Sequence, residues 1–268
     1  MNKHETPRAR EIAEQNTILL TQVGSGLHGV TIDGADDRDE MGVCIEPPEC
    51  VIGLEQMLDL DGALLGAFEQ YQFRTQPEGH RSGPGDLDLV IYSLRKWTQL
   101  AAQGNPTVLL LLFAPDAEIV QRNEWGESLQ ANKDLFLSKD CGRRFLGYLK
   151  AQKEQMLGQR SKHTNRPELI EIHGYDTKFA YHALRLGIQG QQLIETGQVS
   201  LPMLKPHREY LKQVRQGLYT KEQVLDAIDG LYSELETLTN GTDLPDKPNT
   251  EKINRWLIES YESWWNRS

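Results

Sequence analysis

Two short patterns near the start of the chain suit phosphate and cation binding. Gly24-Ser25 follows an apolar run, and Asp37-x-Asp39 lies within the acidic segment that comes next. Because side chains alternate faces along an extended strand, Asp37 and Asp39 are expected to point the same way. Adjacent carboxylates repel unless they share a divalent cation, and oxygen ligands favour Mg²⁺ or Mn²⁺. The Ser25 hydroxyl and the backbone N–H groups around Gly24 and Gly26 suit the terminal phosphates of a nucleoside triphosphate.

A third carboxylate is expected from a neighbouring strand. The segment GDLDLVIY places Asp88 at the start of an alternating apolar run, which makes Asp88 the candidate and Asp86 the nearby alternative. Three acids around two cations suit in-line nucleotidyl transfer, because one cation activates the attacking hydroxyl and the other neutralises the leaving pyrophosphate. The pattern therefore predicts Asp37, Asp39 and Asp88 as catalytic metal ligands.

The same segment matches two other motifs less well. Gly24, Gly26 and Gly29 satisfy GxGxxG, with Glu46 as a ribose-binding acid, but the residues that follow are β-branched and acidic rather than a helix that could hold a pyrophosphate. A calcium loop starting at Asp37 lacks oxygen ligands at the fifth and twelfth places. The dinucleotide motif stays open as the weaker alternative.

The wider sequence around these residues resembles a known family. The strings GSGLHG, DDRDEMGV, DLDLVIYSLRKW and GNPTVLLLLF are similar to the predicted nucleotidyltransferases of the RlaP family, within the DNA polymerase beta nucleotidyltransferase superfamily, which is associated with bacterial RNA repair. The resemblance covers roughly residues 17–115 and extends through HGYDTKFAYHALRLG. The chain departs from the family at Asp36-Asp37, where Ser-Asp is common.

The resemblance implies a small mixed sheet that carries Ser25 and the three aspartates, with a helical domain closing over the nucleotide. It also favours a phosphate-binding role for Lys178, His182 and Arg185. Spacings of four and three residues place these side chains on one face of a helix. The alternative for that face is a solvated stripe of charge.

The periodicity of the sequence supplies the elements that must position these residues. It predicts strands at 17–23, 41–45 and 87–92, an extended segment at 63–75, and helices at 7–15, 93–102, 143–157, 168–186, 208–215, 221–238 and 251–265. The Gly-rich segment 24–29 is expected to be a turn. We therefore expect an α+β protein, with a nucleotidyltransferase catalytic domain at 1–138 and a helical domain at 139–268 that closes the active-site cleft.

The distribution of charge bears on a nucleic-acid partner. The formal net charge is −10, so a polyanion would have to use a local basic patch or bridging cations. Residues 141–166 hold seven bases against one acid. This stretch is a candidate RNA contact through Arg143, Arg144, Lys150, Lys153, Arg160 and Lys162. The alternative is that it forms the solvated face of a long helix.

Composition excludes several classes of protein. The apolar fraction of 38% is typical of a globular protein. The longest apolar run, 108–114, is far shorter than the roughly 20 residues of a membrane helix. The N-terminal segment has no apolar signal core, which favours the cytoplasm and no membrane partner. Three cysteines without a CxxC pair are expected to be reduced thiols.

The sequence leads to one main hypothesis and two competitors. The main hypothesis is a metal-dependent nucleotidyltransferase that moves a nucleoside monophosphate from a nucleoside triphosphate to a hydroxyl, with an RNA 3′ end favoured by the family resemblance. One competitor is a nucleotide-binding regulator of the same fold that performs no transfer. The other is an oxidoreductase, which would bind a nicotinamide cofactor without a metal requirement.

Overall fold

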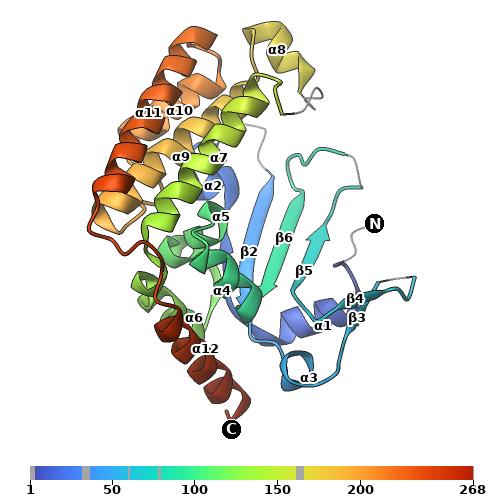
Figure 1. Cartoon of the computed structure of the whole chain (residues 1–268). Helices are drawn as coiled ribbons and strands as arrows, with labels where there is room; N and C mark the ends of the chain where they lie inside the picture. Colours follow the sequence, from blue (N-terminus) through green and yellow to red (C-terminus); the bar gives the residue numbers. More distant parts are fainter. Residues whose placement is uncertain (1–3, 32–36, 60, 78–79, 161–165, 268) are drawn as a thin grey trace. The chain divides into compact units, whose positions relative to one another are not determined.

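The computed structural model describes residues 4–31, 37–59, 61–77, 80–160 and 166–267. The chain divides into two compact units (Figure 1). The sheet unit comprises Met1–Ala102, Leu110–Leu135 and Asn249–Ser268, and the helical unit comprises Gln103–Leu109 and Phe136–Pro248. The α+β class and the small mixed sheet expected from the sequence are confirmed.

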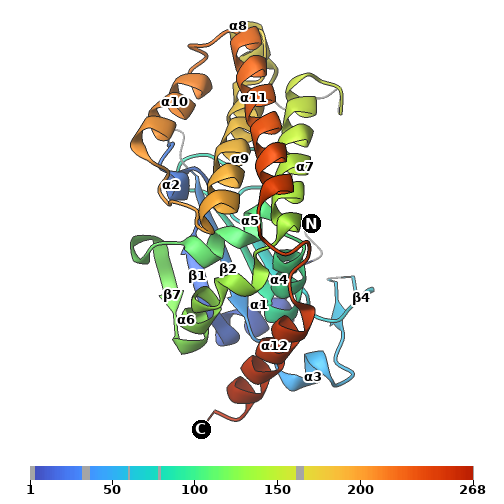
Figure 2. The ribbon, with the colours of Figure 1, turned by 60° about the vertical axis from the view of Figure 1, so that its left-hand side comes forward.

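Among the described residues, the main sheet of this unit has five strands in the order β5-β6-β2-β1-β7, with β7 at one edge beside β1 (Figure 2). Their bounds are β1 Thr17–Gln22, β2 Arg38–Cys44, β5 Gln70–Arg74, β6 Leu87–Ser93 and β7 Ile119–Arg122. β2 and β6 are parallel, and the other neighbouring strands are antiparallel. In this register Asp88 of β6 faces Asp39 of β2 on one side and Arg74 of β5 on the other.

Short helices and a second small sheet complete the sheet unit. The helices are α1 Pro7–Asn16, α2 Gly24–His28, α3 Pro48–Val51, α4 Leu94–Ala102, α6 Glu124–Ala131 and α12 Thr250–Trp265, with 3₁₀ turns η1 Leu110–Phe113 and η2 Asp116–Glu118. The second sheet pairs β3 Met57–Leu58 with β4 Leu64–Gly66. Thr6 caps α1 through the backbone N of Ala9 at 3.2 Å. The helix then buries Ile12 and Ala13 in a cluster with Tyr71 and other apolar side chains of the sheet unit.

Glu46 connects three segments of the sheet unit. Its buried carboxylate accepts a hydrogen bond from the backbone N of Leu94, at the start of α4, at 3.2 Å, and another from the Tyr261 hydroxyl of α12. The Trp265 indole donates to the Glu46 carbonyl oxygen at 3.0 Å. These contacts account for the grouping of α12 with the sheet unit, far along the sequence from the strands. The domain limits expected from the sequence, 1–138 and 139–268, stay a prediction.

Replacing Glu46 by glutamine should change how stability depends on pH. Burial raises the pKa of Glu46 to about 7. In an unfolded chain a glutamate has a pKa of about 4.3. The folded protein therefore holds this proton more tightly, so the free energy of unfolding falls as the pH rises between these two values. Above the folded pKa this loss of unfolding free energy amounts to roughly 4 kcal/mol, and Glu46→Gln removes it.

Urea unfolding at about pH 5 and about pH 8 measures this effect, because the two conditions lie on either side of most of the titration. The exposed Glu49→Gln variant controls for the loss of one acidic side chain and should keep the wild-type pH dependence. A Glu46→Gln variant whose stability varies with pH as the wild type does would contradict the prediction.

The helical unit is centred on one long helix. Its helices are α5 Pro106–Leu109, α7 Lys139–Met156, α8 Pro167–His173, α9 Thr177–Thr196, α10 Lys205–Arg215 and α11 Lys221–Gly241, and η3 Lys133–Phe136 lies at the junction with the sheet unit. α9 contacts α7, α10 and α11. A Cβ at Gly190 would lie 2.8 Å from Leu235 and 3.0 Å from Phe145, so this glycine permits the close approach of α9 to both α11 and α7.

The structure corrects two expected elements. The helix expected at 168–186 is two helices, because Gly174 adopts a left-handed conformation with φ of 79° and Asp176 caps a new helix. The turn expected at 24–29 is the one-turn helix α2 followed by left-handed Gly29. None of the helices in the described part of the chain has the length and apolar character that a membrane crossing requires.

Candidate active site

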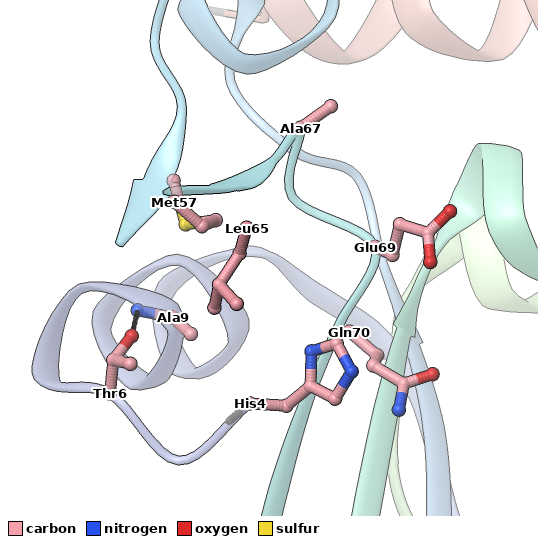
Figure 3. Close-up of a pocket in the computed structure, with 8 residues that line it drawn as sticks. All are labelled: His4, Thr6, Ala9, Met57, Leu65, Ala67, Glu69 and Gln70. Carbon is pink, nitrogen blue, oxygen red and sulfur yellow. Dashed lines mark hydrogen bonds between the residues drawn. The ribbon is translucent and has the colours of Figure 1, made fainter. Parts of the chain in front are cut away.

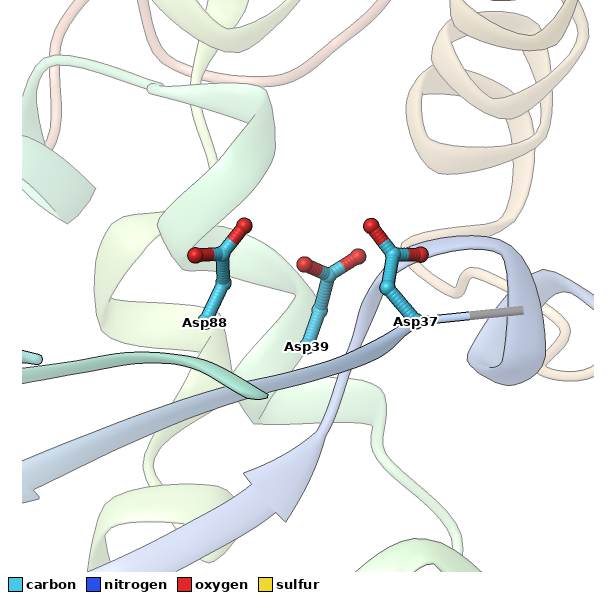
Figure 4. A group of neighbouring side chains, drawn as sticks. All are labelled: Asp37, Asp39 and Asp88. Atoms are coloured by element: carbon cyan, nitrogen blue, oxygen red, sulfur yellow. The ribbon is translucent and has the colours of Figure 1, made fainter. Parts of the chain in front are cut away.

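The structure brings the three predicted aspartates together. One carboxylate oxygen each of Asp37, Asp39 and Asp88 lies within 4.8 Å of the other two. Figure 4 shows the three side chains pointing the same way, with Asp39 in the middle. Asp37 and Asp39 share a face because they are two residues apart, and Asp88 joins them because it is the partner of Asp39 across the parallel strands. All three side chains are half-buried.

This acidic triad has the donor chemistry of a divalent cation site. Its ligand atoms are carboxylate oxygens only, which suit Mg²⁺ or Mn²⁺ rather than the softer metals that prefer nitrogen or sulfur. Asp86, the alternative third ligand, is not in this group. Its two carboxylate oxygens instead accept hydrogen bonds from the Thr75 hydroxyl at 3.0 Å and from the backbone N of Gly83 at 2.9 Å, within the segment between β5 and β6.

The glycine turn lies directly against the triad. Gly24 has φ of 71°, and a Cβ at this position would lie 2.0 Å from Oδ2 of Asp39. The backbone N of Val23 also donates to the carbonyl oxygen of Asp39 at 2.8 Å. Ser25 and Gly26, which the sequence analysis predicted to bind phosphate together with Gly24, follow within α2, and Ser25 is half-buried. The turn and the middle aspartate are therefore packed as one structural element.

Three side chains that the sequence analysis missed hold Asp88. Arg74 donates from Nε to Oδ1 at 2.5 Å and from a terminal nitrogen to Oδ2 at 3.0 Å. Gln76 donates to Oδ1 at 3.0 Å, and the Ser82 hydroxyl donates to Oδ2 at 2.8 Å. The Arg74 guanidinium, with smaller contributions from Ser82 and Gln76, holds the pKa of Asp88 below its usual value. A predicted hairpin of β5 and β6 could have identified Arg74 from the sequence, since this hairpin pairs position 74 with position 88.

The predicted phosphate-binding residues lie on α9 of the helical unit. Asp176 caps this helix through the backbone N atoms of Lys178 and Phe179 at 3.0 and 3.2 Å, and it also accepts from Nε of Arg166 at 3.1 Å. Arg185 donates to Oε1 of Gln189 at 2.8 Å, while its buried Nε has no hydrogen-bond acceptor among the described residues. Lys178 is exposed.

His182 of α9 lies in a strongly positive environment. Burial lowers the pKa of His182 well below its usual value, and four cations lower it further: Arg185, Lys178, Arg166 and Arg215. This environment favours the neutral imidazole, which can donate one hydrogen bond but carries no charge. Arg215 also stacks on the Tyr181 ring at 5.3 Å. Arg166 and Arg215 are additions to the residues that the sequence analysis assigned to this site.

The basic stretch proposed for RNA is partly neutralised within the helical unit. Arg143 pairs with Asp140 at 2.8 Å and with Asp246 at 3.2 Å. Arg144 donates to the carbonyl and side-chain oxygens of Gln103, and Lys153 pairs with Asp229. Lys150 and Arg160 are exposed, and Lys162 lies outside the described residues. Contact of this stretch with RNA stays a prediction.

Two other features of the sheet unit do not form a nucleotide site. The buried Glu46 is held by α4 and α12, so it is not available as the ribose-binding acid of the dinucleotide motif. A small cavity of about 50 Å³ lies beside α1 and is lined by His4, Thr6, Ala9, Met57, Leu65, Ala67, Glu69 and Gln70 (Figure 3). Ligand pockets usually measure about 300 Å³ or more, so this cavity is too small for a nucleoside.

The chain was compared with protein families and with known proteins. A family model described as RlaP, RNA repair pathway DNA polymerase beta family, matches residues 1–259. No curated protein matches the chain. Among solved structures, the chain is similar to a nucleotidyltransferase-like protein from Exiguobacterium sibiricum 255-15, with a TM-score of 0.29 and 11% sequence identity over 94% of this chain and 76% of that chain.

Proposed function

This chain belongs to the RlaP family, an RNA repair pathway DNA polymerase beta family of nucleotidyltransferases, and we propose that it transfers a nucleoside monophosphate to a hydroxyl acceptor with the help of divalent metal ions. The donor is a nucleoside triphosphate, ATP being the first candidate, and the second product is pyrophosphate. The favoured acceptor is the 3′ end of an RNA.

The single observation that carries this proposal is the acidic triad. Three carboxylates that meet within 4.8 Å repel one another, and a divalent cation bound among them would offset this repulsion. Asp37, Asp39 and Asp88 would hold Mg²⁺ or Mn²⁺. When bound, such ions activate the attacking hydroxyl and neutralise the charge that develops on the leaving pyrophosphate.

The chain's own groups bind and orient the reactants. The Ser25 hydroxyl and the backbone amides of Gly24 and Gly26 would hold the β and γ phosphates, since the turn is already packed against Asp39. From the helical unit, Lys178 and Arg185 would offset the negative charge of the triphosphate, and neutral His182 would donate a hydrogen bond to it. Closure of this unit over the nucleotide is part of the same proposal.

The acceptor is proposed from the family rather than from the site. An RNA repair pathway supplies RNA ends as substrates, and the exposed Lys150 and Arg160 remain available to contact a phosphate backbone. Binding through these two side chains should weaken as the salt concentration rises, because each contact between a basic side chain and a phosphate releases a condensed counterion.

Transfer of label from each α-labelled nucleoside triphosphate tests the proposal. The reaction is run with Mg²⁺, with Mn²⁺ or with a chelator, and it is offered RNA oligonucleotides that end in a 3′-hydroxyl or in a blocked 3′ position. Of the two kinds of RNA, we expect label only on the one that ends in a 3′-hydroxyl, and only with metal. Metal-dependent triphosphate binding without transfer to any acceptor would favour the nucleotide-binding regulator, and metal-independent binding of a nicotinamide cofactor would favour the oxidoreductase.

A further inference from the structure

The hydroxyl of Ser82 contacts the triad directly. It donates a hydrogen bond to Oδ2 of Asp88 at 2.8 Å. The Gln76 amide donates to the Ser82 oxygen and also to Oδ1 of Asp88 at 3.0 Å, which fixes the orientation of both groups. A hydroxyl that is about to attack phosphorus needs this arrangement, with its proton directed at a base and its lone pair free to react.

The glycine turn and Ser82 contact different aspartates of the triad. Gly24 lies against Asp39, whereas Ser82 contacts Asp88, and Figure 4 shows Asp39 between Asp88 and Asp37. If the turn binds the terminal phosphates, the α-phosphorus of the triphosphate projects toward Asp88. In-line transfer requires the attacking oxygen and the leaving pyrophosphate to lie on opposite sides of that phosphorus. In a complex of this kind Ser82 would lie on the attacking side, because it contacts Asp88 whereas the turn is packed against Asp39.

We propose that Ser82 is an internal acceptor, so that the protein transfers one nucleoside monophosphate to its own Ser82 when no external acceptor is bound. This inference rests on the proposed function. The Ser82 oxygen forms a bond to the α-phosphorus, and the bond from that phosphorus to the bridging oxygen breaks. The electron pair leaves with pyrophosphate, and the Ser82 proton is released to solvent. The product is a phosphodiester on serine.

Two structural features distinguish Ser82 from the neighbouring hydroxyl of the same segment. The Thr75 hydroxyl donates to Asp86 at 3.0 Å and accepts from the backbone N of Leu87 at 2.9 Å, and no bond to Asp88 is made. Ser82 is half-buried and contacts the triad directly. Thr75→Val is therefore a matched control that removes a hydroxyl from the same segment.

Modification of the protein itself tests the inference. Wild-type protein is incubated with ATP and Mn²⁺ without RNA and then analysed by intact mass and by tryptic peptide mapping. Cleavage after Arg81 and Arg95 gives a peptide that contains Ser82 and Ser93, and fragmentation separates these two sites. We expect one nucleoside monophosphate per chain, on Ser82. Ser82→Ala should lower the modification at least tenfold, whereas Ser82→Thr and Thr75→Val should retain it.

Mixing two forms of the protein tests whether a chain modifies its own Ser82 or that of another chain. Asp39→Asn protein keeps Ser82 but lacks the middle aspartate, so it should stay unmodified beside active wild type if the reaction is intramolecular. Transfer to RNA by a wild-type protein that never carries an adduct, or carries it on another residue, would overturn the inference and leave the proposed function intact. Absence of both reactions would instead count against the proposed function.

Discussion

Asp39→Asn is expected to lower nucleotidyl transfer by about a thousandfold or more, equivalent to roughly 4 kcal/mol of transition-state stabilisation. Asp39 is the middle residue of the triad. It lies against the glycine turn, and it is paired with Asp88 across β2 and β6. The substitution keeps the shape of the side chain but removes the charge that two cations would share. Loss of activity should therefore come with weaker metal binding and an intact fold.

Two measurements separate this effect from misfolding. Steady-state transfer with saturating triphosphate gives the loss of activity, and Mn²⁺ binding followed by paramagnetic resonance or calorimetry gives the loss of affinity without turnover. Asp226→Asn makes the same chemical change at an exposed position of α11 and should behave as the wild type. An Asp39→Asn protein with more than a tenth of wild-type activity would contradict the metal-ligand role.

Gly24→Ala is expected to reduce transfer by about a hundredfold through geometry rather than charge. A Cβ at position 24 would lie 2.0 Å from Oδ2 of Asp39, so either the turn or the carboxylate must move. The left-handed φ of 71° adds a backbone cost of about 1–2 kcal/mol for a residue with a side chain. We expect KM for the triphosphate to rise and kcat to fall, because both the phosphate-binding turn and the triad are displaced.

Gly62→Ala is the matched control for this prediction. Gly62 has a similar φ of 82°, but a Cβ there would have nothing within 4 Å. The control therefore carries the backbone cost without the collision, and we expect a small loss of thermal stability with full activity. If Gly24→Ala and Gly62→Ala had equal activities, close packing of the turn against Asp39 would have no role in the reaction.

The carboxylate of Asp88, a proposed metal ligand, already accepts hydrogen bonds from other side chains. Its carboxylate accepts from Arg74, Gln76 and Ser82, and the guanidinium offsets part of the charge of the triad. Without this cation, three carboxylates within 4.8 Å would destabilise the sheet edge more strongly. A cation bound at the triad would therefore have to compete with Arg74 for the oxygens of Asp88.

Local sequence determined the features that depend on neighbours along the chain. The two-residue spacing of Asp37 and Asp39 predicts a shared face in any extended segment, and the structure confirms that the two side chains point the same way. The apolar alternation after Asp88 likewise predicted β6, and the spacing of Lys178, His182 and Arg185 placed all three on one helix, now α9. The family resemblance could also be identified from the sequence, because the motif residues lie in short segments.

Only the tertiary structure decided the contacts that depend on strand register and long-range packing. Pairing of β2 with β6 sets Asp88 opposite Asp39, and pairing of β5 with β6 brings Arg74 to the same carboxylate. Register is fixed by which side chains the whole sheet buries, so no local pattern specifies it. Long-range packing also decided the position of Glu46. The sequence analysis considered this residue as a ribose ligand, but it is buried beside Tyr261 of α12. The sequence thus indicated the chemistry of the site, and the packing of distant segments determined which residues assist it.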